Sequence, residues 1–299
     1  MRDALMMQRV FIGSAAIAAG ELTRYQLRAH CRRIFPDVYA YGSGELSIRD
    51  RAVAAVLWSR GRAIVTGLAA SAAHGARWVD ASAPIELNFP NNKAPAGIIS
   101  RAETLLDDEV HLIPGLPVTT LPRTAFDLAR RGTVRQAVTR VDALANATRL
   151  AVDDVLALLP RHPNVRGVRR VPAILDLTDA GSQSPRETWL RLLLIAAGFP
   201  RPETQIPVLR DDGRSYYFLD MGWRDVMVAI EYDGEQHRLE RSIYRNDRTR
   251  SEYIADVGWR RIRVVAGDRT ADIVERTRRA RTLSQTSVRR NRADRRSGV

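Results

Sequence analysis

Apolar residues recur at helical spacing over much of the first 180 positions, and short β-rich runs interrupt them. Apolar positions three and four residues apart predict amphipathic helices, at 48–60, 67–74, 120–130, 134–144 and 153–159. Runs rich in β-branched residues predict strands, at 84–88, 110–113 and 118–119. This mixture of helices and short strands predicts the α+β fold class.

Basic residues surround a capping position near the start of the chain. Thr23 is a favourable N-cap for the next helix, and a turn and a short strand follow at 35–40. Helix, turn, Arg-rich helix and strand is the order of a winged helix-turn-helix, which we predict for residues 1–45. In that arrangement four arginines contact DNA phosphates and the groove: Arg24, Arg28, Arg32 and Arg33. The alternative is a small helical subdomain with a solvated basic face.

The pattern changes after a polar, turn-rich segment at 179–184. A helix is predicted to begin at the cap residue Ser184 and to end at Gly198. Alternating β-rich segments then predict two adjacent strands, at 215–223 and 226–234, and a final strand at 259–265. We therefore predict a mixed α/β and helical region over 46–180 and a separate domain over 181–275.

Acidic residues mark the two adjacent strands. Asp220 interrupts a hydrophobic strand, a position where aspartate is strongly depleted. Glu231 and Asp233 end the next strand two residues apart, so both side chains point to one face of the sheet. Three neighbouring carboxylates repel each other unless a cation lies between them, and oxygen ligands suit Mg²⁺ or Mn²⁺. The alternative is a solvated strand end with ordinary acids.

Three more side chains join this candidate site, each with a structural alternative. Glu187 is an early acid of the preceding helix, where it can form a capping box with Ser184 or serve the acidic site. His237, four residues after Asp233, is a candidate general base or an exposed loop histidine. Arg250 contacts phosphate, or belongs to a basic helix face stabilised by an ion pair with Asp247.

The net charge of +13 favours a polyanionic partner. Nearly all of the positive charge is arginine, and the basic segment at 276–299 lacks apolar periodicity, so we predict a disordered tail there. A single cysteine, Cys31, excludes an intramolecular disulfide and a Cys-rich zinc site. No run approaches the ~20 apolar residues of a membrane span, and no secretory signal is evident, so we expect a cytoplasmic protein without membrane partners.

The acidic constellation resembles a bacterial domain family related to the very-short-patch mismatch repair endonuclease, within the PD-(D/E)XK superfamily. The resemblance rests on Glu187, Asp220, the run from Glu231 to His237, Arg250, and Trp259 before the last strand. It implies an αβββαβ core with Asp220 and Glu231 as principal metal ligands, Glu187 as an accessory acid and His237 in a catalytic role. The usual lysine, two residues after the second acid, is replaced by Asp233.

The N-terminal region resembles the winged-helix region of type IV abortive-infection antitoxins, through Leu22 to Leu27, Val38-Tyr39 and the segment from Thr66 to Gly75. This resemblance implies DNA binding and a cognate toxin as partner. The leading hypothesis is a DNA-binding, divalent-metal-dependent endonuclease. Two alternatives remain: an antitoxin-like DNA-binding regulator whose nuclease fold is inactive, and a nuclease that acts on RNA.

Overall fold

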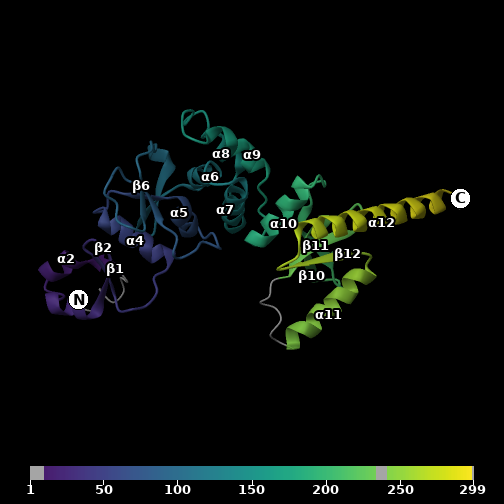
Figure 1. The fold of residues 1–299 in the computed structure, drawn as a ribbon, viewed down its shortest axis with the longest axis horizontal. Coiled ribbons are helices and arrows are strands. Elements are labelled where there is room, and N and C mark those ends of the chain that lie inside the picture. The colour runs from purple at the N-terminus through teal and green to yellow at the C-terminus, as the bar shows by residue number, and fades with distance from the viewer. Residues whose placement is uncertain (1–9, 234–240, 298–299) are drawn as a thin grey trace. The chain divides into compact units, whose positions relative to one another are not determined.

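A computed structural model describes residues 10–233 and 241–297, with the backbone alone at 241–248 and 287–297. The chain divides into two compact units, residues 1–178 and 179–299, whose elements are labelled in Figure 1. The division falls at the start of the polar segment 179–184. Helices and mixed sheets occur in both units, so the predicted α+β class is confirmed.

The N-terminal unit begins with a three-stranded antiparallel sheet in the order β1-β3-β2. Its elements are β1 (Val10–Ile12), α2 (Gly13–Ala18), α3 (Arg24–His30), β2 (Cys31–Phe35) and β3 (Val38–Tyr41). Thr23 caps α3 as predicted, in a capping box with Gln26. The helix ends at His30, however, so Arg32 and Arg33 lie on β2 rather than on the Arg-rich helix.

A five-stranded sheet in the order β6-β5-β4-β8-β7 follows in the same unit. Its strands are β4 (Ile64–Thr66), β5 (Ile85–Asn88), β6 (Ile98–Arg101), β7 (Val110–Ile113) and β8 (Leu116–Thr119). The helices α4 (Ile48–Trp58) and α5 (Gly67–Ala73) pack on it. Val10 and Val38 of the first sheet share a buried core with Val65 and Leu87 of the second. The predicted boundary at residue 45 thus runs through a common core.

A helical layer completes the N-terminal unit. It consists of α6 (Leu121–Ala129), α7 (Val134–Ala147), α8 (Val152–Leu156) and α9 (Val171–Asp176), with short 3₁₀ turns at 107–109 and 168–170. The fully buried guanidinium of Arg123 lies within this layer, paired with Glu109 (Nη1–Oε2 2.5 Å) and Asp127 (Nε–Oδ2 3.3 Å). Glu109 also bonds His162, at 2.6 Å. Helix packing here therefore surrounds a buried ionic network.

The C-terminal unit contains a four-stranded sheet in the order β12-β11-β10-β9. Its elements are α10 (Pro185–Ala196), β9 (Glu203–Leu209), β10 (Tyr216–Trp223), β11 (Val228–Asp233), α11 (Arg241–Asp256), β12 (Arg260–Val265) and α12 (Thr270–Ser297). Strands β9, β10 and β11 are antiparallel neighbours, whereas β11 and β12 run parallel. Parallel pairing requires a crossover, and α11 supplies it.

Helices cover both faces of this sheet (Figure 1). One apolar cluster joins Leu190 and Leu194 of α10 and Ile273 of α12 to Ile230 of β11. A second cluster, on the α11 side, joins Ile254 to Leu219 of β10 and its neighbours. Two cores therefore fix the hairpin β10-β11 from opposite sides.

The segment after residue 270 is a helix, so the prediction of a disordered tail over 276–299 is wrong as far as Ser297. The helix packs on β11 and β12 through positions at helical spacing, namely Ile273, Thr277, Ala280, Arg281 and Ser284. Most of these side chains are small or polar, which hid the periodicity in the sequence. None of the described helices has both the length and the apolarity that a bilayer crossing requires.

Candidate functional site

Asp220 lies where strands β10 and β11 part. Paired residues run from Trp223↔Val228 to Met221↔Ile230. Asp220 comes directly before Met221 on β10. Its carboxylate accepts the backbone N–H of Tyr232 (Oδ2–N 2.9 Å). A side-chain bond thus replaces a backbone bond of the ladder, which explains how an aspartate is accommodated within a hydrophobic strand.

The environment of Asp220 opposes ionisation of its carboxyl group. Burial, together with the negative charges of Glu187 and Glu231, raises the pKa of Asp220 from 3.8 to about 7. The hydrogen bond from Tyr232 and the positive charge of Arg250 act in the opposite direction but are weaker. Three acids from α10, β10 and β11 therefore interact electrostatically at one place, and one of them is only partly ionised near neutral pH.

Glu187 has a structural role besides its proximity to Asp220. Its carboxylate accepts the hydroxyl of Ser184 (Oε1–Oγ 2.8 Å) and the backbone N–H of Gln183 (Oε2–N 2.9 Å). The Ser184 hydroxyl in turn accepts the Glu187 N–H, at 3.2 Å. The capping interaction expected as the alternative is therefore present. Burial also raises the pKa of Glu187, which is 9% exposed.

Glu231 is held by two arginines. Its side chain is 9% exposed and pairs with Arg250 of α11 (Oε1–Nη2 2.5 Å) and Arg261 of β12 (Oε2–Nη1 3.0 Å). Arg250 also donates to the backbone carbonyl of Phe218, at 2.7 Å. The arginine predicted to contact phosphate is thus placed directly beside the acids.

Asp233 is more peripheral. It pairs with Arg263 of β12 (Oδ2–Nη2 2.8 Å), whose side chain is nearly half exposed. No electrostatic effect of Asp233 on Asp220 is among the main causes of the raised pKa. The structure therefore brings together Glu187, Asp220 and Glu231, with Asp233 at the rim.

The three acids supply only oxygen atoms, which are the ligands that suit a hard divalent cation. A cation would also offset the repulsion that Glu187 and Glu231 exert on the anionic form of Asp220. Among the residues that the structure describes, no group of three or more His, Cys, Asp or Glu side chains is spaced to hold a metal ion as it stands. Two guanidinium groups lie against the Glu231 oxygens in the same place.

The other predicted residues lie elsewhere or outside the described part. His237 falls among residues 234–240, which are outside it, and the side chain of Asp247 is likewise not described. Arg24 and Arg28 are exposed on α3, and Arg32 and Arg33 are exposed on β2, all in the N-terminal unit.

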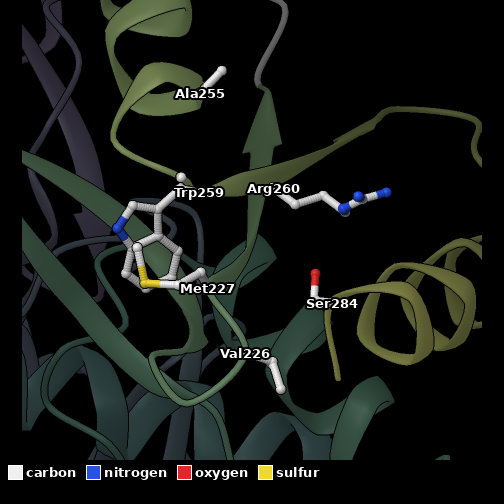
Figure 2. A pocket seen from close by; sticks show the side chains of 7 residues that line it. Val226, Met227, Ala255, Trp259, Arg260 and Ser284 are labelled. Atoms are coloured by element: carbon white, nitrogen blue, oxygen red, sulfur yellow. The ribbon is translucent and has the colours of Figure 1, made fainter. Parts of the chain in front are cut away.

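An open pocket of about 440 Å³ lies at the other end of the sheet (Figure 2). It is lined by Val226, Met227, Ala255, Gly258, Trp259, Arg260 and Ser284. Val226 and Met227 precede β11 and Arg260 begins β12, whereas Glu231 and Asp233 are near the far end of β11. Because β11 and β12 are parallel, this pocket is distinct from the acidic site.

Sequence reasoning missed the two β12 arginines as partners of the acids. Arg261 and Arg263 alternate with Ile262 and Val264, and this alternation placed them on one face. The sequence does not reveal the strand order. The pairing of β12 with β11 brings Arg261 and Arg263 to the acids.

Comparison with known proteins yields little. No family model matches the sequence, and no solved structure matches it. Two curated proteins from two strains of Mycobacterium tuberculosis, each described as uncharacterized, are 27% identical to this chain over 121 residues. The aligned part covers 40% of this chain and 44% of each relative. The chain thus matches less than half the length of these relatives.

Proposed function

We propose that the C-terminal unit is a divalent-metal-dependent endonuclease that hydrolyses phosphodiester bonds in DNA. The observation that carries the proposal is the raised pKa of Asp220, caused by burial and by the charges of Glu187 and Glu231. A buried acid cluster of this kind costs stability, and perturbed carboxyl groups cluster at functional sites. The net charge of +13 adds support for a polyanionic substrate.

In this proposal Asp220 and Glu231 hold Mg²⁺ or Mn²⁺, and Glu187 is an accessory acid. When bound, such an ion polarises the scissile phosphate and lowers the pKa of a coordinated water. Exposed arginines bind the phosphate backbone of the substrate. Arg186 at the start of α10 and Arg263 on β12 are candidates, because both residues are exposed; Arg186 lies over the ring of Tyr232, and Arg263 pairs with Asp233.

Arg250 has a separate role. It neutralises Glu231 in the absence of metal and anchors α11 to the carbonyl of Phe218. If its guanidinium turns from Glu231 to a substrate phosphate, the Glu231 oxygen becomes available as a ligand. The arginine contacts thus keep a buried acid satisfied before the site is loaded.

The test is cleavage of supercoiled plasmid with Mg²⁺ or Mn²⁺ by the wild type, Asp220→Asn and Glu231→Gln. Asp211→Asn is the matched control, because Asp211 is an exposed aspartate in the loop before β10. We expect cutting by the wild type and by the control only. Cutting that survives in Asp220→Asn contradicts the assignment of Asp220 as a metal ligand. An RNA substrate in the same assay tests the alternative that the nuclease acts on RNA.

A second candidate function is that of an antitoxin-like DNA-binding regulator whose nuclease fold is inactive. The elements at the N-terminus follow the order β1-α2-α3-β2-β3, and their sheet has the order β1-β3-β2. This arrangement is compatible with a winged helix. The exposed arginines on α3 also favour DNA binding. A cognate toxin as partner rests on sequence resemblance alone.

The regulator makes different predictions. Arg24→Ala with Arg28→Ala should weaken DNA binding, whereas Arg135→Ala, an exposed arginine on α7, should not. Under this candidate the wild type cuts no DNA, and Asp220→Asn leaves DNA affinity unchanged. Loss of binding in the Arg24 and Arg28 variant together with metal-dependent cutting would support both functions in one chain.

A further inference from the structure

Helix α12 has two parts with different surroundings. Its first part packs on β11 and β12 through buried positions, the last of which is Ser284. Gln285 and Thr286 directly after it are exposed, and the helix continues to Ser297. In Figure 1 this continuation extends beyond the strands of the sheet. We call residues 285–297 the C-terminal arm.

The C-terminal arm is strongly basic. Nine arginines and three acids lie on α12, so this one helix supplies six of the thirteen net positive charges of the chain. The arm itself has a single acid and five arginines, namely Asp294 and Arg289, Arg290, Arg292, Arg295 and Arg296. Like charges three or four residues apart destabilise a helix. A polyanion bound to the arm would remove this repulsion.

The helical register distributes these arginines over two sides of the arm. Residues three, four or seven apart share a side of a helix, which places Arg289, Arg292 and Arg296 in one row. Arg290 is about 100° away around the helix. Eleven residues make about three turns, so Arg290 lies in line with Arg279, which is exposed. The arm is therefore complementary to a ligand with anionic groups on both sides of a helix.

Duplex DNA is such a ligand. The major groove of B-DNA is about 12 Å wide and has a phosphate backbone on either side, and an α-helix with its side chains is about 10–12 Å across. Guanidinium groups bind phosphate through paired hydrogen bonds. The major groove of A-form RNA is deep and narrow, so a helix fits duplex RNA poorly.

A lipid surface is a poorer partner for the arm. A helix that lies in a membrane interface buries an apolar face. The arm has two apolar residues, Val288 and Ala293, and they are five positions apart, which puts them on different sides of the helix. Charge without an apolar face favours the phosphates of a nucleic acid.

We propose that the C-terminal arm lies in the major groove of duplex DNA and holds the protein on the phosphate backbone, independently of base sequence. This inference rests on the proposed function for the identity of DNA as the substrate, but binding by the arm is measurable without metal and without cleavage. The arm contributes affinity, and the acids around Asp220 carry the chemistry.

The test is fluorescence anisotropy of a dye-labelled DNA duplex with the full chain in EDTA over a series of salt concentrations. The arm variant removes three charges and keeps good helix formers: Arg289→Gln, Arg292→Gln and Arg296→Gln. The control variant removes three charges at exposed arginines of the N-terminal unit: Arg135→Gln, Arg149→Gln and Arg169→Gln. Circular dichroism shows that both variants are folded.

Each phosphate contact contributes about 0.9 to the slope of log affinity against log salt concentration. The arm variant should therefore have a slope smaller by roughly 2–3 and bind duplex DNA at least about tenfold more weakly at low salt. The control variant should keep nearly the wild-type slope, although its net charge equals that of the arm variant.

Four results would overturn the proposal. They are an unchanged slope in the arm variant, an equal fall in the control variant, an equal fall on duplex RNA, and poly-glutamate that displaces DNA from the wild type at equal charge concentration. Phosphatidylserine vesicles that bind the wild type but not the arm variant, with DNA affinity equal in both, would assign the arm to a membrane instead.

Failure of the nuclease is distinguishable from failure of the arm. Duplex binding that depends on the arm, combined with no cutting at any metal concentration, rejects the nuclease and keeps the arm. Metal-dependent cutting of duplex DNA by the arm variant with the wild-type KM rejects the arm and keeps the nuclease.

Discussion

Asp220→Asn should stabilise the metal-free protein, and more so as the pH rises. The amide has almost the shape of the carboxyl group and its oxygen can still accept the Tyr232 N–H, at the position where the carboxylate accepts it at 2.9 Å. What the substitution removes is a negative charge that is buried beside Glu187 and Glu231. Stability is thus gained at the expense of the proposed metal site.

The size and sign of the change in the free energy of unfolding follow from the two pKa values of Asp220. The pKa rises from 3.8 in the unfolded chain to about 7 in the folded protein. Folding therefore favours the protonated acid, so the stability of the wild type is highest below the unfolded pKa and falls as the pH rises through the folded pKa. Each pKa unit corresponds to about 1.4 kcal/mol, which makes the total fall on the order of 4 kcal/mol.

The assay is urea unfolding followed by tryptophan fluorescence at a series of pH values without divalent metal. Three of the five tryptophans lie in the C-terminal unit: Trp189, Trp223 and Trp259. The free energy of unfolding of Asp220→Asn minus that of the wild type should be near zero at about pH 4 and should approach roughly 4 kcal/mol above about pH 8. Asp211→Asn, at an exposed aspartate, should show no such growth.

A stability difference that stays constant with pH, or a variant less stable than the wild type at alkaline pH, would contradict a raised pKa of Asp220. Either result would mean that Asp220 is already ionised and stabilised in the folded protein, and the electrostatic argument for a cation site would be lost.

The remaining predictions concern packing and charge. Arg123→Met removes from the buried Glu109 the guanidinium that pairs with it, so it should cost roughly 3–5 kcal/mol, measured as a lower urea midpoint of the N-terminal unit. Ile273→Ala should cost roughly 2–5 kcal/mol in the C-terminal unit if α12 packs as described, and no loss would show that the helix is detached. Arg250→Met removes a charge that lowers the pKa of Asp220, so the carboxyl should titrate at a higher pH than in the wild type, measured by NMR of a selectively labelled chain.

The local elements of the site were predictable because their signals are local. Ser184 caps α10 at its N-terminus, and the β-rich run around Asp220 defines a strand that the structure also has. Glu187 shows the limit of such signals. Its carboxylate takes part in the helix cap, and its charge also raises the pKa of Asp220. Sequence spacing alone left these two roles as alternatives.

Long-range pairing was not predictable. Glu231 is bound by Arg250 and Arg261, which come from different elements and meet it only because α11 carries the chain across to a parallel β12. Helix α12 was hidden for another reason. Its contact positions include Thr277 and Ser284, which a hydrophobicity pattern does not register, so burial had to come from the surrounding fold.

If the acids around Asp220 form a divalent-metal site, calorimetric titration of the full chain with Mn²⁺ should detect it. We expect Mn²⁺ binding by the wild type and by Asp211→Asn, and loss of binding in Asp220→Asn and Glu231→Gln, with all four proteins folded by circular dichroism. Binding that persists unchanged in Asp220→Asn, or a wild type that binds no Mn²⁺, would contradict it.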